Sequence, residues 1–122
     1  MAQETLSIAV SSSPDGAQLF SLGGSLDLAT SPSLRATLME AADREKHEII
    51  VDLSDLEFLD STGLGALIGA HKRAAEHGGS VRLVAQEGQI LRLLRITGLL
   101  DVFAVYPTLE AALSDDARLI GL

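Results

Sequence analysis

Two adjacent hydroxyl side chains, Ser61 and Thr62, stand where an apolar strand pattern gives way to an apolar helix pattern. A hydroxyl at the start of a helix can accept a hydrogen bond from a backbone N–H group and so cap the helix. A phosphate group there would sit on the exposed N–H groups of the first turn. The position can therefore hold a neutral cap or a dianion without rebuilding the fold, as a phosphorylation switch requires.

The residues around these hydroxyls are acidic on one side and small on the other. They are Asp55, Glu57 and Asp60 in an expected loop, and Gly63, Gly65 and Gly69 in the helix that follows. A phosphate in the acidic loop would add about −1.5 to −2 charges and create a strongly negative surface. Each glycine inside a helix costs roughly 1 kcal/mol relative to alanine. The glycines leave a bare strip of backbone, which either the protein's own sheet or a partner protein can approach.

The segment Asp60-Ser61-Thr62-Gly63 resembles several enzyme motifs, but each of these motifs is incomplete here. An aspartic protease needs one hydroxyl between Asp and Gly, and a second copy of the motif. A serine hydrolase needs a glycine two residues before its serine, with a histidine and a carboxylate as partners. A dinucleotide fingerprint lacks its third glycine, because Ile68 stands there, and no Walker loop is present. His71 and His77 are six residues apart, whereas helical metal ligands prefer three or four. The sequence predicts no catalytic residues, no metal site and no cofactor.

Composition predicts one domain over residues 1–122. Apolar residues make up 47% of the chain, which suits a modest core, and there are no cysteines, which removes disulfides and thiolate metal sites. The net charge of −8 argues against direct binding to nucleic acid or to an anionic membrane surface. No signal peptide is evident, and no apolar run is long enough to span a bilayer. We therefore expect a cytoplasmic location and no membrane insertion.

The hydrophobic periodicity predicts an α/β fold with the element order β-β-α-β-α-β-α-β-α. The expected strands carry Leu6 to Val10, Ala17 to Leu22 (ended by Gly23-Gly24), Ile49 to Leu53, Val81 to Ala85 and Val102 to Val105. The expected helices are a segment capped by Thr30 or Ser31 with Leu34, Leu38 and Ala41-Ala42, then Thr62 to His77, Gln89 to Ile96 and Leu109 to Leu113. On the second helix, the expected apolar face is Leu64, Leu67, Ile68, His71, Ala74 and Ala75.

Four ordered motifs then identify a family. The segment Phe58-Leu59-Asp60-Ser61-Thr62-Gly63-Leu64-Gly65 resembles the signature of the STAS domain, in particular of bacterial anti-sigma factor antagonists. Gly24-Ser25-Leu26-Asp27 resembles the Gly-Glu-Leu-Asp turn of that family, and Val51-Asp52-Leu53 the strand before its switch serine. Thr97-Gly98-Leu99 through Phe103 resembles a later family motif. The similarity runs from about Leu6 to Leu113 and implies a mixed sheet of about five strands with about four helices mainly on one side.

The resemblance also implies partner switching. The unphosphorylated protein would bind an anti-sigma factor, itself a serine kinase, and so free the sigma factor. Phosphorylation at Ser61 would end the binding, and a serine phosphatase would restore it. ATP belongs to the kinase, so the chain would need no cofactor. An alternative keeps the fold without the switch, as a STAS scaffold module of a transporter or a signalling assembly.

The expected partner-binding residues surround the acceptor. They are Ser25, Asp27, Asp60, Ser61, Thr62, Gly63, Gly65 and Gly69. Ser25 departs from the glutamate that is frequent in the family, which puts a charged contact there in doubt. Asp27 is open to two interpretations, a turn or capping carboxylate, or a surface contact beside Ser61. Thr62 could in principle replace Ser61 as the acceptor, although the motif aligns with Ser61.

Overall fold

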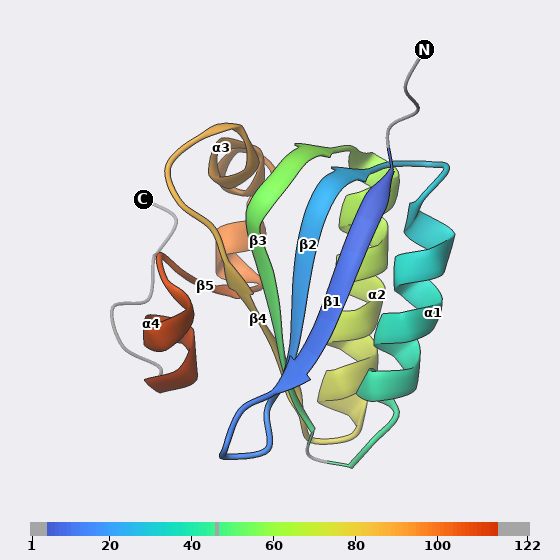
Figure 1. The fold of residues 1–122 in the computed structure, drawn as a ribbon, viewed down its shortest axis with the longest axis vertical. Helices are drawn as coiled ribbons and strands as arrows, with labels where there is room; N and C mark the ends of the chain where they lie inside the picture. Colours follow the sequence, from blue (N-terminus) through green and yellow to red (C-terminus); the bar gives the residue numbers. More distant parts are fainter. Residues whose placement is uncertain (1–4, 46, 115–122) are drawn as a thin grey trace.

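The computed structural model describes residues 5–45 and 47–114 and shows a five-stranded sheet packed with helices (Figure 1). The elements are β1 (Leu6–Ser12), β2 (Gln18–Leu26), α1 (Ser31–Ala42), β3 (Glu48–Leu59), α2 (Ser61–Glu76), β4 (Ser80–Val84), α3 (Gln89–Ile96), the short 3-10 helix η1 (Leu99–Asp101), β5 (Ala104–Tyr106) and α4 (Leu109–Ser114). Residues 1–4, 46 and 115–122, which the expected single domain includes, lie outside the described residues. None of the described helices is long and apolar enough to cross a bilayer.

The sheet is mixed, as expected from the alternation of strands and helices. Its strand order is β1-β2-β3-β4-β5, with β1 antiparallel to β2 and every later neighbour parallel. Buried leucines of α1, α2 and α3 pack on one face and form the main core, and α1 and α2 run side by side along that face in Figure 1. A smaller cluster around Ile50, Val84, Tyr106 and Ala112 lies under α4 on the other face. The predicted arrangement, with helices mainly on one side, is confirmed.

The largest difference from the sequence prediction concerns β3. The expected acidic loop after Leu53 does not form, because the strand continues to Leu59. Its second half pairs with an equally extended β2, so that Gly23 lies opposite Asp55 and Leu26 opposite Leu59. One register irregularity lies between these two pairs, at Gly24/Ser25, and another lies just before them, at Ser21/Gly23. Acidic side chains therefore project from a strand rather than from a loop.

The glycine pair that was expected to end β2 lies inside it. Gly24 has a φ of 88°, and a side chain there would collide with the backbone carbonyl of Thr5. Glycine is required because the β1 backbone approaches closely and because φ is positive. The pair lets β2 continue through its register irregularities and reach the end of β3.

Smaller differences concern helix faces and ends. Helix α2 starts one residue earlier than predicted, at Ser61, and Ala75 is exposed although it was placed on the apolar face. Thr30 occupies the N-cap position of α1 but makes no side-chain capping bond. Residues 99–101 form η1, so β5 begins at Ala104 rather than at Val102. Helix α3 has the predicted bounds.

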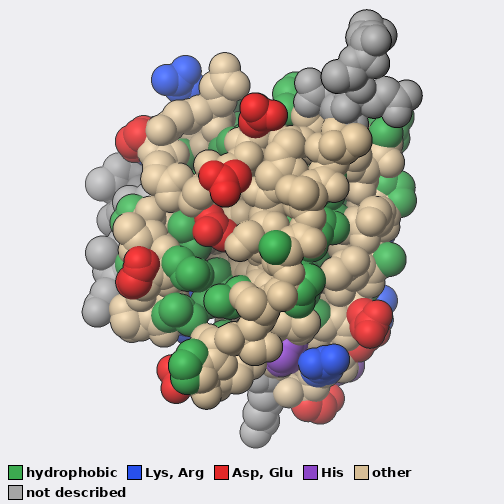
Figure 2. Space-filling model, in the orientation of Figure 1, with side chains coloured by type: hydrophobic (Ala, Val, Ile, Leu, Met, Phe, Trp, Pro, Cys, Tyr) green, Lys and Arg blue, Asp and Glu red, His purple; other side chains and the backbone are tan. Residues whose placement is uncertain are grey.

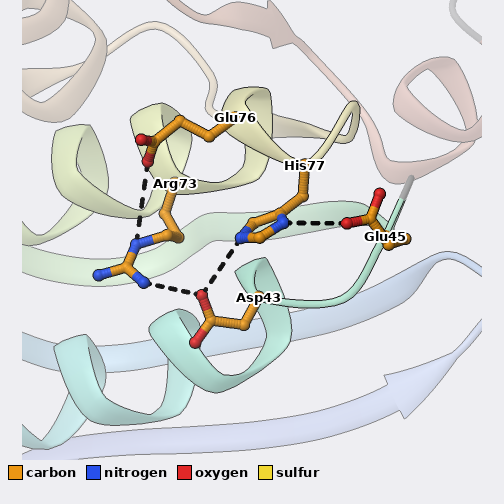
Figure 3. A network of polar contacts seen from close by, with 5 residues as sticks. All are labelled: Asp43, Glu45, Arg73, Glu76 and His77. Carbon is orange, nitrogen blue, oxygen red and sulfur yellow. Dashed lines mark hydrogen bonds and ion pairs between the residues drawn. The ribbon is translucent and has the colours of Figure 1, made fainter.

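The far end of α2 is tied to the segment after α1 by a polar network (Figure 3). Arg73 lies 2.9 Å from Asp43 and 4.0 Å from Glu76, and His77 lies 3.2 Å from Glu45 and 3.6 Å from Asp43. These side chains are partly or largely exposed, so each pair contributes at most about 1 kcal/mol. The network fixes the end of α2 that is remote from Ser61.

The glycines of α2 face the protein's own elements. A Cβ at Gly63 would lie 2.7 Å from Leu26 Cγ and 2.7 Å from Leu59 Cδ1, both of them core residues. A Cβ at Gly69 would lie 2.9 Å from Met39 Cε, on α1. At Gly65 the nearest atom would be Arg35 Nη2, at 3.8 Å. The bare strip thus faces α1 and the sheet.

These distances predict opposite effects for two alanine substitutions in the same helix. We expect Gly63→Ala to lower the free energy of unfolding by about 1–3 kcal/mol, because the methyl group overpacks the core. Gly65→Ala should leave it unchanged or raise it by up to about 1 kcal/mol, because the methyl group has room and helix propensity improves. Urea denaturation of both variants measures the difference. Equal stability of the two variants would contradict the close packing at Gly63.

Candidate functional site

Helix α2 is capped by a carboxylate rather than by a hydroxyl. Asp60 is the N-cap residue, and its Oδ1 accepts hydrogen bonds from the backbone N–H groups of Thr62 and Gly63, both at 3.0 Å. The hydroxyl of Thr62 donates to the same oxygen at 2.5 Å. The expectation that Ser61 or Thr62 caps the helix is therefore wrong. A carboxylate is the stronger acceptor and is favoured by the helix dipole, so it takes the position.

Asp60 also joins α2 to the connection between β2 and α1. Its own backbone N–H donates to the carbonyl of Leu26 at 3.2 Å, and the backbone N–H of Leu28 approaches its carboxylate. The pKa of Asp60 lies below its usual value, chiefly because of the Thr62 hydroxyl and then because of the Gly63 N–H group. Desolvation raises the pKa and so opposes this shift, whereas the backbone N–H groups of Thr62 and Leu28 lower it further. The carboxylate is thus ionised at neutral pH and holds two loops together.

The two hydroxyls differ in accessibility. Ser61 is the first residue of α2 and is exposed, whereas Thr62 is half-buried with its hydroxyl bonded to Asp60. A modifying enzyme can therefore approach the Ser61 side chain directly. To reach the Thr62 hydroxyl, it would have to compete with the carboxylate.

Asp27 serves the turn before α1. Its Oδ1 accepts from the backbone N–H groups of Ala29 and Thr30, at 3.0 and 3.1 Å, and lies 3.2 Å from the Thr30 hydroxyl. That hydroxyl also donates to the carbonyl of Ser25 at 2.8 Å. Of the two interpretations of Asp27, the structure supports the turn carboxylate, and a partner contact stays a prediction. Together these bonds brace the loop that presents Leu28.

The remaining predicted partner-binding residues are less accessible. Ser25 is only 1% exposed and Gly63 is buried, so we do not include them in a docking surface. Gly65 and Gly69 are half-buried beside α1. The structure does bring Asp60, Ser61 and Thr62 together at the start of α2.

Two apolar side chains at this end of the molecule were missed by the sequence analysis. Leu28 is 73% exposed and Phe58 is 51% exposed. Leu28 adjoins Asp60 through its backbone, and Phe58 precedes Asp60 by two residues at the end of β3. We call the set Leu28, Phe58, Asp60, Ser61 and Thr62 the acceptor surface. Exposed apolar residues beside a modifiable hydroxyl are suited to a protein interface that a phosphate can disrupt.

The wider setting of the acceptor surface is acidic. Asp55 and Glu57 project from β3 and are exposed. Acidic side chains are visible over β3 in the space-filling view (Figure 2). Among the described residues, no cluster of three potential ligands could hold a metal ion.

The histidines are engaged elsewhere in the fold. His47 Nε2 lies 2.9 Å from Gln18 Oε1, and His77 belongs to the network in Figure 3. The ring of His71 lies 5.0 Å from that of Phe103, and burial lowers the pKa of His71. These contacts assign each histidine a structural setting apart from Ser61.

Comparison with known proteins identifies the family. A model described as the STAS domain matches residues 10–112. The anti-sigma F factor antagonist of Paenibacillus polymyxa is 33% identical over 101 residues, which cover 82% of this chain and 86% of the relative. The anti-sigma-B factor antagonist of Bacillus subtilis strain 168 is 33% identical over 84 residues, 69% of this chain and 76% of the relative.

Solved structures of anti-sigma factor antagonists have the same fold as this chain. An anti-sigma factor antagonist from Mycobacterium paratuberculosis has a TM-score of 0.82 and 31% identity, over 93% of this chain and 96% of its own. Two structures of SpoIIAA share the fold at 21% identity. The unphosphorylated form has a TM-score of 0.75 over 89% of this chain and 95% of its own. The phosphorylated form from Bacillus has a TM-score of 0.70 over 89% of this chain and 98% of its own. The chain therefore belongs to the STAS domain family, among the bacterial anti-sigma factor antagonists.

Proposed function

We propose that this protein is a partner-switching regulator controlled at Ser61. In the unphosphorylated state it binds an anti-sigma factor that is also a serine kinase, and the sigma factor is released. Phosphorylation of Ser61 ends this binding, and a serine phosphatase restores it in the cytoplasm. The relatives are named as antagonists of anti-sigma factors, which makes them regulatory binding proteins rather than enzymes. The observation that carries the proposal is the exposed Ser61 hydroxyl within the acceptor surface.

Ser61 is the preferred acceptor for a geometric reason. A kinase must direct the acceptor oxygen at the γ-phosphate, which requires a hydroxyl that is free to turn. The Thr62 hydroxyl is held on Asp60 at 2.5 Å in a half-buried position, while the Ser61 side chain is exposed. Phosphorylating Thr62 would disrupt the cap of α2, whereas phosphorylating Ser61 leaves the cap in place.

The phosphate would act through charge more than through refolding. A helix N-terminus favours an anion by roughly 0.3–1 kcal/mol. Here, however, Asp60 already accepts from the Thr62 and Gly63 N–H groups, so a phosphate on Ser61 would meet a carboxylate next to it. The added charge would therefore point towards solvent and towards the partner. Because the core lies below α2, the domain itself should stay folded.

The loss of binding follows from desolvation. Docking a partner on Leu28 and Phe58 removes water from the acceptor surface, and a dianion there resists that removal. Asp55 and Glu57 add to the negative charge and make the phosphorylated surface repel any acidic partner surface. A loss of about 3 kcal/mol would weaken affinity more than a hundredfold.

The alternative function is a non-switching STAS module in a transporter or signalling assembly. One structure of an anion transporter, murine Slc26a9, shares the fold with a TM-score of 0.64 and 16% identity, over 93% of this chain and 22% of its own. That likeness concerns the fold alone. Mass spectrometry of the protein from its host separates the two proposals: phosphate at Ser61 favours the switch, and an unmodified Ser61 in a copurifying membrane complex favours the module.

If the charge of the phosphate on Ser61 blocks partner binding, two Ser61 variants should behave differently. Ser61→Ala should bind the anti-sigma factor even after incubation with kinase and ATP, because no phosphate can be added. Ser61→Asp should bind at least tenfold more weakly with its melting temperature little changed. Isothermal titration calorimetry and thermal denaturation measure both. Gln89→Glu is a matched control, because Gln89 is the exposed first residue of α3 and gains a charge there. If Ser61→Asp weakened binding only in proportion to lost stability, the charge account would be wrong.

The acceptor assignment predicts a second pair of results. Thr62→Val should still be phosphorylated by the kinase, because the Ser61 hydroxyl stays exposed. Ser61→Ala should not be phosphorylated, because the Thr62 hydroxyl is held by Asp60. Peptide mass spectrometry after the kinase reaction identifies the modified residue. Phosphate on Thr62 in the Ser61→Ala variant would refute the geometric argument.

The acceptor surface predicts which apolar side chain the partner covers. Leu28→Ser should weaken binding tenfold or more, because a buried leucine contributes about 1.5–3 kcal/mol. Ile96→Ser is the matched control: Ile96 is 74% exposed and Leu28 is 73% exposed, but Ile96 lies at the end of α3. Binding of the unphosphorylated variants to the anti-sigma factor tests this. Equal affinities of the two variants would remove Leu28 from the interface.

A further inference from the structure

Strand β1 forms a long open edge of the sheet. It is the outermost strand, pairs with β2 over seven residues, and has no second neighbour among the described residues. The opposite edge strand, β5, has only three residues. A short edge limits unwanted pairing, whereas a long one offers a template for another strand.

The hydrogen-bond phase shows which backbone groups point outward. Ser25 donates to the carbonyl of Thr5 at 3.0 Å, and Ser13 donates to the carbonyl of Ala17 at 2.8 Å. In an antiparallel ladder, alternate residues bond to the same neighbour, so the odd-numbered residues of β1 face β2. The even-numbered residues, Leu6 to Ser12, therefore direct their N–H and C=O groups away from the sheet.

This edge lacks the usual protection. The segment Leu6–Ser12 contains no charged residue and no proline, although 21% of the whole chain is charged. Natural edge strands are commonly blunted by lysine, proline or a bulge. Figure 2 shows tan and green surface where β1 runs, with acidic side chains over β3 instead. Val10, near the middle of β1, is 52% exposed.

We propose that β1 pairs with β1 of a second copy of this chain, antiparallel about a two-fold axis at Ala9. Ala9 then lies opposite its counterpart, Ile8 opposite Val10, Ser7 opposite Ser11, and Leu6 opposite Ser12. The register matches the hydrogen-bond phase, because outward-facing residues meet outward-facing residues. On one sheet face the small side chains Ser7, Ala9 and Ser11 adjoin without crowding. On the other face Ile8 covers the exposed Val10 of the partner copy.

The charges near β1 do not oppose self-association at this edge. The chain carries −8, so two copies repel at long range. Beside β1, however, the charged residues that line the shallow hollow against α1 are Glu40 and Arg44, one of each sign. The acidic residues near Ser61 lie at the end of β3, two strands away. One strand pair buries less than a standard interface, so the dimer should be weak and concentration-dependent.

Single cysteines test the register, because the natural chain has none. Ala9 would lie in a non-hydrogen-bonded pair with Cα atoms about 4.5 Å apart, which a disulfide can bridge. Ala9→Cys should therefore form a covalent dimer under mild oxidation. Ser7→Cys alone should not, because the two copies of Ser7 would be about 14 Å apart. A mixture of Ser7→Cys and Ser11→Cys should form the heterodimer. Ser21→Cys is the control one strand in from the edge, because Ser21 is exposed on β2 directly opposite Ala9.

Sedimentation velocity tests the unmodified chain. The natural protein should dimerise with rising concentration, Ala9→Lys should remain monomeric, and Ser21→Lys should behave like the natural protein. Monomers at every soluble concentration, or a dimer that Ala9→Lys leaves intact, would overturn the proposal. So would equal cross-linking of Ala9→Cys and Ser7→Cys. The result is independent of partner switching, because Ala9→Lys should still bind the anti-sigma factor with unchanged affinity.

Discussion

The acceptor surface depends on one carboxylate, that of Asp60. It accepts hydrogen bonds from the first turn of α2 and lies near the Leu28 N–H group, while the backbone N–H of Asp60 donates to the carbonyl of Leu26. The end of β3, the start of α2 and the connection after β2 therefore meet at a single side chain. The backbone of Ser61 is held in place because the residue before it is fixed, while its side chain stays exposed. Replacing the Asp60 carboxylate by a neutral hydroxyl would leave the β3–α2 junction and the β2–α1 connection joined only through backbone contacts.

The position of Asp60 depends in turn on the length of β3. That strand reaches Leu59 only because β2 extends to Leu26 beside it, across Gly23 and Gly24. The sequence analysis ended both strands early, since charged residues and glycines are unfavourable in isolated strands. Parallel pairing along the whole of β2 overrides these local preferences. The acidic residues Asp55 and Glu57 are consequently displayed on a rigid strand rather than on a loop, which fixes the electrostatic setting of Ser61.

What the sequence could predict was local. Apolar periodicity predicted the element order and the bounds of α3, and the motif around Ser61 predicted the family. What it could not predict required knowledge of neighbours. The choice of Asp60 over Ser61 as the cap is a competition between adjacent acceptors. Phe58 is exposed and Ser25 buried although they are paired on β3 and β2, and the exposed Leu28 lies in the connection after β2. Spacing alone carries no information on such contacts.

The carboxylate also changes how a phosphate on Ser61 must be understood. An empty helix N-terminus would draw the phosphate onto its N–H groups and partly neutralise it. Here the N–H groups of Thr62 and Gly63 already donate hydrogen bonds to Asp60, so a phosphate would keep its charge beside an ionised Asp60. A larger fraction of that charge is then presented to the solvent and to an approaching partner. A capping aspartate directly before the acceptor thus favours a switch that alters the surface while α2 and the core beneath it keep their arrangement.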